Sequence, residues 1–260
     1  DKQLDIGSES TFYRVLRDAG QLARRGRAKA PARVRPPPLE ATGPNQVWSW
    51  DITYLPTSVR GVWLYLYLVI DVWSRKVVAW DVAEREEAQI AADLVSRACL
   101  RERISKGRPQ PLILHADNGN AMRAATLESR LEELGVLRSF SRPRVSNDNP
   151  YSESQFRTLK YRPGFPDRFG CIQDSRAFCQ QFFTWYNDQH CHSGIALLTP
   201  SMVHFGQAPT VLTQRQLVLD AAYLAHPERF VRRAPNVQPL PGMVWINKPV
   251  SSDSPERNTH

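Results

Sequence analysis

Apolar and polar side chains alternate along the segment QVWSWDITYL, residues 46–55, with the two-residue period of a half-buried β-strand. Two more apolar runs follow: WLYLYLVIDVW at 63–73, after a turn at Arg60 and Gly61, and KVVAWDVA at 76–83. Strands joined by such short connections pair with each other in antiparallel fashion. The pattern therefore predicts three consecutive strands that form a meander.

Beyond the meander, helical patterns alternate with short buried strands. The helical patterns occupy residues 85–104, 124–135, about 149–160 and 175–190, and the strands occupy 111–117 and 136–141. Gly135 ends the second helix, whereas Asn149 and Pro150 begin the third as N-cap and first helical residue. The order βββαβαβα predicts an α/β fold with a mixed five-stranded sheet flanked by helices.

The two ends of the chain differ from this central part in composition. Residues 8–18 predict a short helix with Ser8 as N-cap, and residues 21–38 form a linker with six Arg or Lys residues, no acid and three closing prolines. After about residue 200 the chain is rich in proline, with one strand-like piece at 242–250. We therefore expect an N-terminal helix and basic linker at 1–44, a main domain at 45–205 and a small C-terminal extension at 206–260.

Charge and composition narrow the class of partner. The 260 residues include 34 Lys and Arg against 26 Asp and Glu, a net charge of +8, which favours a polyanionic partner. The four cysteines form no CxxC pair and no signal peptide precedes them, which fits a reducing cytoplasm. The most apolar run, at 62–73, is too short to span a bilayer and contains Asp71, so we expect no membrane segment.

Three acids stand out by their positions. Asp51 lies in the middle of the first strand, Asp117 ends the fourth, and Glu153 lies early in the helix after the fifth. If these elements are neighbours the carboxylates converge, and like charges so close need a cation to neutralise them. Carboxylate oxygens suit Mg²⁺ or Mn²⁺, and two such ions can promote in-line displacement at phosphorus. The acids therefore predict a two-metal site that acts on a nucleic-acid backbone.

Each acid also has a purely structural interpretation. Asp51 fits a satisfied edge residue, Asp117 begins an Asp-Asn-Gly turn, and Glu153 favours the positive end of its helix. Asp71, another strand acid, is expected to be structural. The joint placement of the first three acids is what favours the metal site.

Basic residues accompany the third acid. Glu153, Arg157 and Lys160 fall at i, i+4 and i+7 on one helical face, so the two cations are expected to grip phosphates beside the metals. An ion pair between Glu153 and Arg157 fits the same spacing. Further phosphate contacts are expected from Arg142 and Arg144 in the preceding loop and from Arg24, Arg25 and Arg27 in the linker.

Several motifs occur in a characteristic order: WDITYL, HADNG, SRPRVSNDNPYSES, WYNDQHCHSGI and a following TP. Together they resemble the integrase-core transposases of bacterial insertion sequences, of the OrfB type, which are related to retroviral integrases. The resemblance covers residues 8 to about 210, and 35 residues separate Asp117 from Glu153. It implies a ribonuclease H-like catalytic core in which Asp51, Asp117 and Glu153 form a DDE triad that holds two Mg²⁺ ions, with Mn²⁺ as a substitute.

The resemblance also implies DNA recombination. The expected reactions are cleavage at the ends of an insertion sequence, with water as nucleophile, and strand transfer by the freed 3′-hydroxyl. The expected partners are double-stranded DNA, both terminal inverted repeats and target, bound by a homodimer or larger assembly. The family pattern matches Lys160 and His192, and Asn118, Asn149 and His192 are candidates to support the metal ligands. The helix at 8–18 resembles the end of a helix-turn-helix segment.

Two other functions stay open at this point. One is a non-catalytic, domesticated DNA-binding protein, which the intact triad disfavours. The other is a ribonuclease H-like nuclease that cuts without joining. In each case the expected location is the bacterial cytoplasm, in association with the nucleoid.

Overall fold

The computed structural model describes residues 8–21, 37–117, 119–141, 149–230 and 233–248, without the side chains of Asn120 and Met122. The chain divides into two compact units, residues 1–35 and 36–260. The described part of the first unit is one helix, α1 (Glu9–Asp18), with Ser8 at its N-cap as predicted. This helix buries none of its residues. The domain boundaries expected at 44 and 205 stay predictions.

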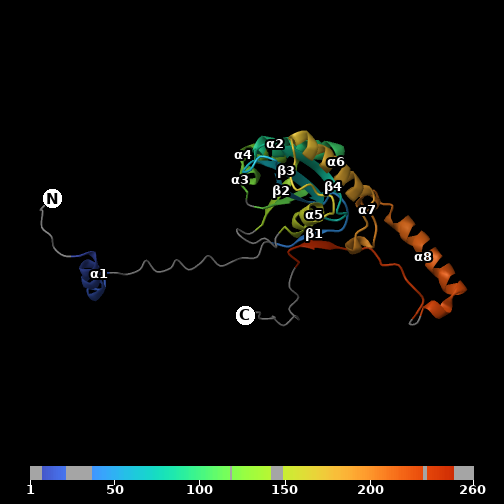
Figure 1. Cartoon of the computed structure of the whole chain (residues 1–260). Helices are drawn as coiled ribbons and strands as arrows, with labels where there is room; N and C mark the ends of the chain where they lie inside the picture. Colours follow the sequence, from blue (N-terminus) through green and yellow to red (C-terminus); the bar gives the residue numbers. More distant parts are fainter. Residues whose placement is uncertain (1–7, 22–36, 118, 142–148, 231–232, 249–260) are drawn as a thin grey trace. The chain divides into compact units, whose positions relative to one another are not determined.

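The second unit is built on a five-stranded sheet (Figure 1). Its strands are β2 (Val47–Pro56), β3 (Trp63–Asp71), β4 (Val77–Ala83), β5 (Ile113–Ala116) and β6 (Leu137–Phe140). They lie in the order β4-β3-β2-β5-β6. β3 pairs antiparallel with both β2 and β4. β5 is parallel to β2, and β6 is parallel to β5. The predicted meander and mixed sheet are confirmed.

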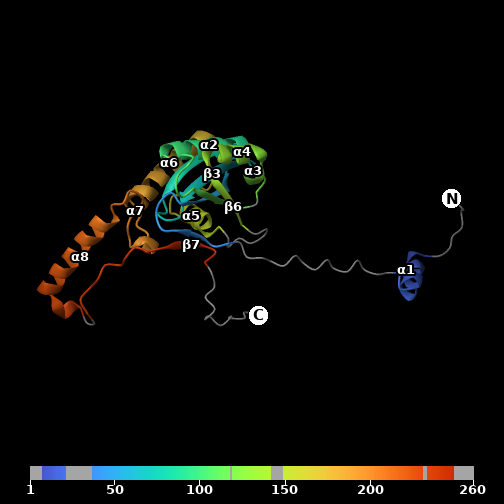
Figure 2. The same ribbon diagram turned by 180° about the vertical axis from the view of Figure 1, so that it is seen from behind.

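Helices cover both faces of this sheet (Figures 1 and 2). One face carries α2 (Ala88–Arg101), α3 (Asn120–Arg123) and α4 (Ala125–Leu134), and the other carries α5 (Pro150–Lys160) and α6 (Ile172–Asp188). Trp50 and Val69 pack toward the first layer, whereas Leu55 and Leu68 pack toward the second. Three layers result because β3 presents apolar side chains to both faces.

A two-stranded sheet joins distant parts of the second unit. β1 (Leu39–Ala41) pairs antiparallel with β7 (Val244–Ile246), and both views show this pair beside α5 (Figures 1 and 2). The Tyr151 hydroxyl of α5 donates a hydrogen bond to the carbonyl oxygen of Trp245 at 2.8 Å. The sequence predicted a strand at 242–250 but not its partner, because three residues are too few to show a period.

The C-terminal part contains helices that the sequence pattern did not assign. They are η2 (Ser193–Ile195), α7 (Pro200–His204), α8 (Ala208–Ala225) and η3 (Pro227–Arg229). The apolar residues of α8 are spread around the helix and do not gather on one face, so no amphipathic period in the sequence reveals it. Among the described residues, no helix is both long enough and apolar enough to cross a membrane.

Asp71, at the end of β3, has the structural role expected of it. It is fully buried, and its carboxylate accepts hydrogen bonds at 2.7 Å from the backbone N–H of Asn45 and from both the N–H and the hydroxyl of Ser74. A buried charge with three donors is satisfied where it lies. Asp71 therefore stabilises the turn between β3 and β4.

Candidate catalytic site

The register between β2 and β5 brings two of the three acids together. The strands are parallel, and Val47 pairs with Ile113 and Trp50 with Ala116. One further step along both chains sets Asp51 opposite Asp117, at the point where β5 ends. The two strands are thus the neighbours that convergence of these carboxylates requires.

Helix α5 lies along β2 and is tied to it on both sides of Asp51. Near the start of the helix, the Ser152 hydroxyl lies 2.5 Å from the Ser49 hydroxyl. At its last residue, the Lys160 ammonium donates a hydrogen bond to the Thr53 hydroxyl at 2.7 Å. Ser49 and Thr53 flank Asp51 at two residues on either side, so the helix spans this acid. Glu153 follows Ser152 directly and therefore comes from the same end of α5.

Asn149 takes part in this connection instead of capping the helix. It is the N-cap of α5, as predicted, but its side chain makes no capping hydrogen bond. Its amide oxygen accepts a hydrogen bond from the Ser49 hydroxyl, and its amide nitrogen donates one to the carbonyl oxygen of Trp50 at 3.2 Å. Both partners lie on β2, immediately before Asp51. Asn149, Ser49 and Ser152 are all buried, so the connection excludes water.

The three acids share one electrostatic environment. Burial, followed by the charge of Asp117 and then that of Glu153, raises the pKa of Asp51 to about 7. The backbone N–H of Ile52 and the Lys160 ammonium act in the opposite direction. Burial also raises the pKa of Glu153. A carboxyl that resists ionisation among other carboxylates gains from a cation placed beside it.

The oxygen atoms available here fit a hard divalent cation. One oxygen of Asp51 accepts from the Ile52 N–H at 2.8 Å, and one of Asp117 accepts from the Gly119 N–H at 2.8 Å. Within the described part of the chain, their second oxygens and the Glu153 carboxylate accept no hydrogen bond. Among the described residues, however, no three acidic, His or Cys side chains lie close enough together to hold one ion.

The two cations of α5 differ in their surroundings. Lys160 is half-buried, and burial lowers its pKa while the charge of Asp51 acts to raise it. Arg157 is exposed one turn earlier. The salt bridges between described residues include none that joins Arg157 to Glu153, so the structural alternative of an i, i+4 pair is not observed.

Several predicted site residues lie outside the described residues: Arg24, Arg25, Arg27, Asn118, Arg142 and Arg144. His192 is described, and its ring packs edge-on against Tyr186 and against His190. Its Nε2 atom is buried without a hydrogen-bond partner in the described part of the chain. Its expected place beside the metal ligands stays a prediction.

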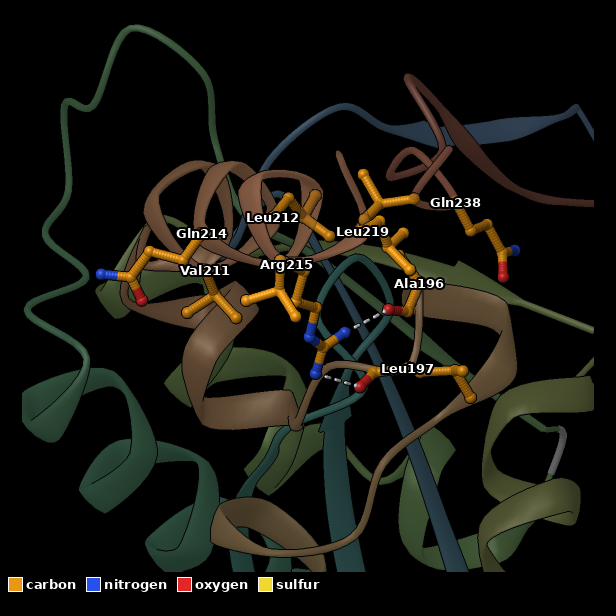
Figure 3. Close-up of a pocket in the computed structure, with 10 residues that line it drawn as sticks. Ala196, Leu197, Val211, Leu212, Gln214, Arg215, Leu219 and Gln238 are labelled. Atoms are coloured by element: carbon orange, nitrogen blue, oxygen red, sulfur yellow. Dashed lines mark hydrogen bonds between the residues drawn. The ribbon is translucent and has the colours of Figure 1, made fainter. Parts of the chain in front are cut away.

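A pocket of about 450 Å³ lies elsewhere, between α8 and the segment around Ala196. Figure 3 shows the Arg215 guanidinium reaching from α8 to the carbonyl oxygens of Ala196 and Leu197, at 3.0 Å each. The pocket lining is mainly aliphatic, and none of it comes from β2, β5 or α5. This pocket is therefore separate from the acids.

Two family models described as "Integrase core domain" match the chain, one over residues 41–146 and the other over residues 134–200. Together they span more than half of the chain and contain all three acids. Residues 41–200 of the chain therefore form an integrase core domain. Its integrase core is therefore the five-stranded sheet with the helices that cover it, and it has the ribonuclease H-like α/β architecture of integrase and transposase catalytic cores.

Curated relatives of this integrase core are transposases. The transposase for insertion sequence element IS904 of Lactococcus lactis subsp. lactis (strain IL1403) is 35% identical over 167 residues, which cover 62% of each chain. Transposase InsF for insertion sequence IS3A of Escherichia coli (strain K12) is 35% identical over 161 residues, 62% of this chain and 54% of the relative. The chain thus spans less than two thirds of the length of these relatives.

A solved structure shows the same fold at lower identity. A chain in the structure of the simian T-cell lymphotropic virus intasome in complex with PP2A regulatory subunit B56 gamma matches with a TM-score of 0.50 and 17% identity. The match covers 66% of this chain and 58% of that one. At this identity the likeness concerns the fold of the integrase core alone.

Sequence reasoning missed the residues that attach α5 to β2. Ser49 and Thr53 were visible only as the polar side of an alternating strand, and nothing local marks them as partners of Ser152 and Lys160. One signal was available. Ser49, Asp51 and Thr53 are polar at alternate positions of β2, and polar residues on one face of a strand that helices cover indicate polar partners on that face.

We expect Asn149→Ala to loosen α5 without unfolding the integrase core. The change removes the acceptor of the Ser49 hydroxyl and the donor to the Trp50 carbonyl, and a buried polar group left without a partner costs about 1–3 kcal/mol. Urea denaturation should show this loss, and hydrogen exchange should show faster opening of α5 amides. Ser154→Ala, at an exposed position of the same helix, is the matched control. Equal behaviour of the two variants would contradict the prediction.

Proposed function

We propose that this chain is the catalytic part of a DNA transposase of a bacterial insertion sequence. In this proposal it cleaves DNA at the ends of the element and joins the freed 3′-hydroxyl to target DNA. One observation supports it most: α5 is attached to β2 on both sides of Asp51, while the β2–β5 register sets Asp117 beside that acid. The transposases among its relatives support the choice of reaction.

In the proposed site, Asp51, Asp117 and Glu153 would hold two Mg²⁺ ions, with Mn²⁺ as a substitute. Such ions act as Lewis acids toward a phosphoryl oxygen, and they lower the pKa of a bound water so that it loses a proton more readily. Two features support this: the three side chains offer carboxylate oxygens, and the pKa of Asp51 is raised to about 7. A carboxyl that holds its proton near neutral pH is stabilised when a cation takes the place of that proton. Lys160 donates a hydrogen bond to Thr53, two residues beyond the same acid, and would hold the phosphate whose ester bond breaks.

The proposed partner is double-stranded DNA, as terminal inverted repeats and as target. Arg157 is exposed on α5 and would contact the backbone next to the site. Arg142, Arg144, Arg24, Arg25 and Arg27 are proposed as further phosphate contacts. Because two element ends must meet for joining, the proposal includes a homodimer or larger assembly on DNA, in the bacterial cytoplasm at the nucleoid.

The proposal is tested by incubating the protein with labelled element-end DNA, Mg²⁺ and a target duplex. We expect cleaved and joined products from the wild type and neither from Asp117→Asn, because the amide cannot neutralise a divalent cation. Glu132→Gln, at an exposed acid of α4, is the matched control and should behave as the wild type. Cleavage without joining would identify a nuclease instead, and DNA binding with no chemistry in any metal would identify a non-catalytic DNA-binding protein.

A further inference from the structure

The first turn of α5 is attached to the C-terminal strand β7 as well as to β2. Tyr151 is the second residue of this helix and lies two positions before Glu153. Its hydroxyl donates a hydrogen bond to the carbonyl oxygen of Trp245 in β7 at 2.8 Å. Figures 1 and 2 show the β1–β7 pair beside α5. Because the acceptor belongs to the backbone of a paired strand, this bond sets the distance between β7 and the start of α5.

The ring of Tyr151 also has neighbours from several strands. It is half-buried and packs against an apolar cluster at the end of the main sheet where β2 begins. The buried members of this cluster are Ala41 of β1, Val244 and Ile246 of β7, Val47 at the start of β2 and Val72 just after β3. The cluster therefore connects the β1–β7 pair both to the main sheet and to the first turn of α5.

A cation contacts the same ring. Arg75 lies in the turn between β3 and β4, and its guanidinium carbon is 4.2 Å from the centre of the Tyr151 ring. The guanidinium also donates a hydrogen bond to the carbonyl oxygen of Val72, and the backbone N–H of Arg75 donates one to the carbonyl oxygen of Asp71 at 2.9 Å. Since a cation is attracted to the face of an aromatic ring, Arg75 holds Tyr151 from a turn that is itself tied to the sheet.

Two attachments in one turn of a helix fix the direction of the side chain that follows them. Successive side chains of an α-helix point about 100° apart. Tyr151 points to β7, and Ser152 points to Ser49 of β2, with 2.5 Å between the two hydroxyl oxygens. Neighbouring residues held by different sheets oppose rotation of the first turn about the helix axis. Glu153 is the next residue of that turn, so its direction depends on both attachments.

The strand that Tyr151 contacts lies outside the part of the chain that matches known integrase cores. The family models match residues 41–146 and 134–200, whereas β7 is formed by Val244–Ile246. The contact with Trp245 spans 94 residues of sequence. A segment beyond the integrase core domain therefore contributes to the attachment of the helix that carries Glu153.

We propose that Tyr151 is a positioning residue for Glu153 and that β7 is thereby part of the catalytic apparatus. This inference rests on the proposed function, because it needs Glu153 to be a ligand of the divalent cation. Tyr151 does not touch the reacting atoms in this proposal. It keeps the Glu153 carboxylate in the direction of Asp51 and Asp117, and a ligand that is held in place loses less conformational freedom when the cation binds.

The test measures Mn²⁺ binding to the full chain without DNA, from the EPR signal of the free ion. We expect Tyr151→Leu, which removes the hydroxyl and the ring, to weaken Mn²⁺ binding roughly ten-fold. Tyr151→Phe removes only the bond to Trp245 and should weaken it less. In Glu153→Gln, which lacks the ligand itself, Tyr151→Leu should weaken binding no further, since Tyr151 acts through Glu153. Tyr223→Leu, on α8 with its ring against Phe230, is the matched control.

Cleavage of element-end DNA gives a second measurement. Tyr151→Leu should lower kcat roughly ten-fold and leave the KM for DNA unchanged, because the proposed DNA contacts come from other residues. Urea denaturation of each variant shows whether it is folded under the assay conditions. A role in fold stability alone would lower the urea midpoint but leave the Mn²⁺ affinity and kcat of the folded variant at their wild-type values.

The outcomes separate this inference from the proposed function. If the wild type binds Mn²⁺ and cuts DNA while Tyr151→Leu does both equally well, Tyr151 has no positioning role and the function stands. If Tyr151→Phe equals the wild type and Tyr151→Leu does not, the assignment of β7 is wrong. Equal weakening with and without Glu153→Gln would mean that Tyr151 does not act through Glu153. If the wild type neither binds Mn²⁺ nor cuts DNA, the function itself fails, and this inference fails with it.

Discussion

Replacing Asp51 with asparagine should abolish DNA cleavage and joining and, at the same time, stabilise the metal-free protein above about pH 7. Loss of activity is expected to reach at least about a thousand-fold, because a preorganised charged group at the reacting phosphate contributes on that scale. The gain in stability follows from the surroundings of this acid, which is partly buried beside Asp117 and Glu153. A neutral amide of nearly the same shape relieves both the burial of charge and the repulsion.

The sign of the pH dependence follows from the pKa of Asp51. It is about 7 in the folded protein and 3.8 in the absence of these surroundings. Between these values the folded state binds the extra proton, so stability falls as pH rises from 3.8 to about 7 and the full penalty is present above that range. Asp51→Asn should therefore raise the free energy of unfolding by on the order of 2 kcal/mol at about pH 8 and by little at about pH 4.

Urea denaturation in EDTA at both pH values, together with the cleavage assay in Mg²⁺, measures the two effects. Asp93→Asn, at an exposed acid of α2, is the matched control and should change neither quantity. Retained cleavage in Asp51→Asn would remove this acid from the proposed site. Unchanged stability would mean that the three carboxylates do not repel one another in solution.

Glu102→Gln should cost about 3 kcal/mol of folding free energy near pH 5.5, because it breaks a buried group of charges. Glu102 follows α2, and its carboxylate accepts hydrogen bonds from the Lys76 ammonium at 2.6 Å and from His204 Nε2 at 2.8 Å. The side chains of Lys76, Glu102 and His204 are 11%, 7% and 2% exposed. Removal of the negative charge leaves the Lys76 ammonium buried without this counter-ion and takes from His204 one of its two carboxylate partners, Asp71 being the other. His204 lies on α7, so this group also attaches the C-terminal helices to the sheet.

Two pKa shifts define the pH window of this effect. Burial acts to raise the pKa of Glu102, but the His204 and Lys76 donors outweigh it and lower the value to about 2. The contribution of Glu102 is therefore complete above its ordinary pKa of 4.5 and is lost as pH falls toward 2. Burial acts to lower the pKa of His204, but the carboxylates of Asp71 and Glu102 raise it overall. Its contribution is complete below 6.5 and is lost as pH rises through the raised value.

The largest cost of Glu102→Gln is therefore expected between about pH 4.5 and 6.5, with smaller costs on either side. Urea denaturation of the variant and the wild type across this range measures it. Glu87→Gln breaks the exposed ion pair with Arg85 and is the matched control, which should show no measurable change. A cost no larger than that of the control would mean that this buried group does not stabilise the fold.

Local pattern was enough to predict most of the sheet and its covering helices. The two-residue period of residues 46–55 and the helical period of 85–104 became β2 and α2. Gly135 ends α4 with a φ of 71°, and Pro150 begins α5, as their conformational preferences require. These features depend on residues only a few positions apart, so the sequence alone contains them. By contrast, the apolar residues of α8 have no period, and β1 is too short to show one.

The sequence by itself determined which elements form this fold and which acids stand where acids are unusual. Only the tertiary structure decided what surrounds those acids, because their neighbours come from distant parts of the chain. Ser49 bonds to Asn149 across 100 residues, and Lys160 bonds to Thr53 across 107. Strand register and helix packing set such pairs, and neither leaves a mark in the local pattern of apolar and polar residues.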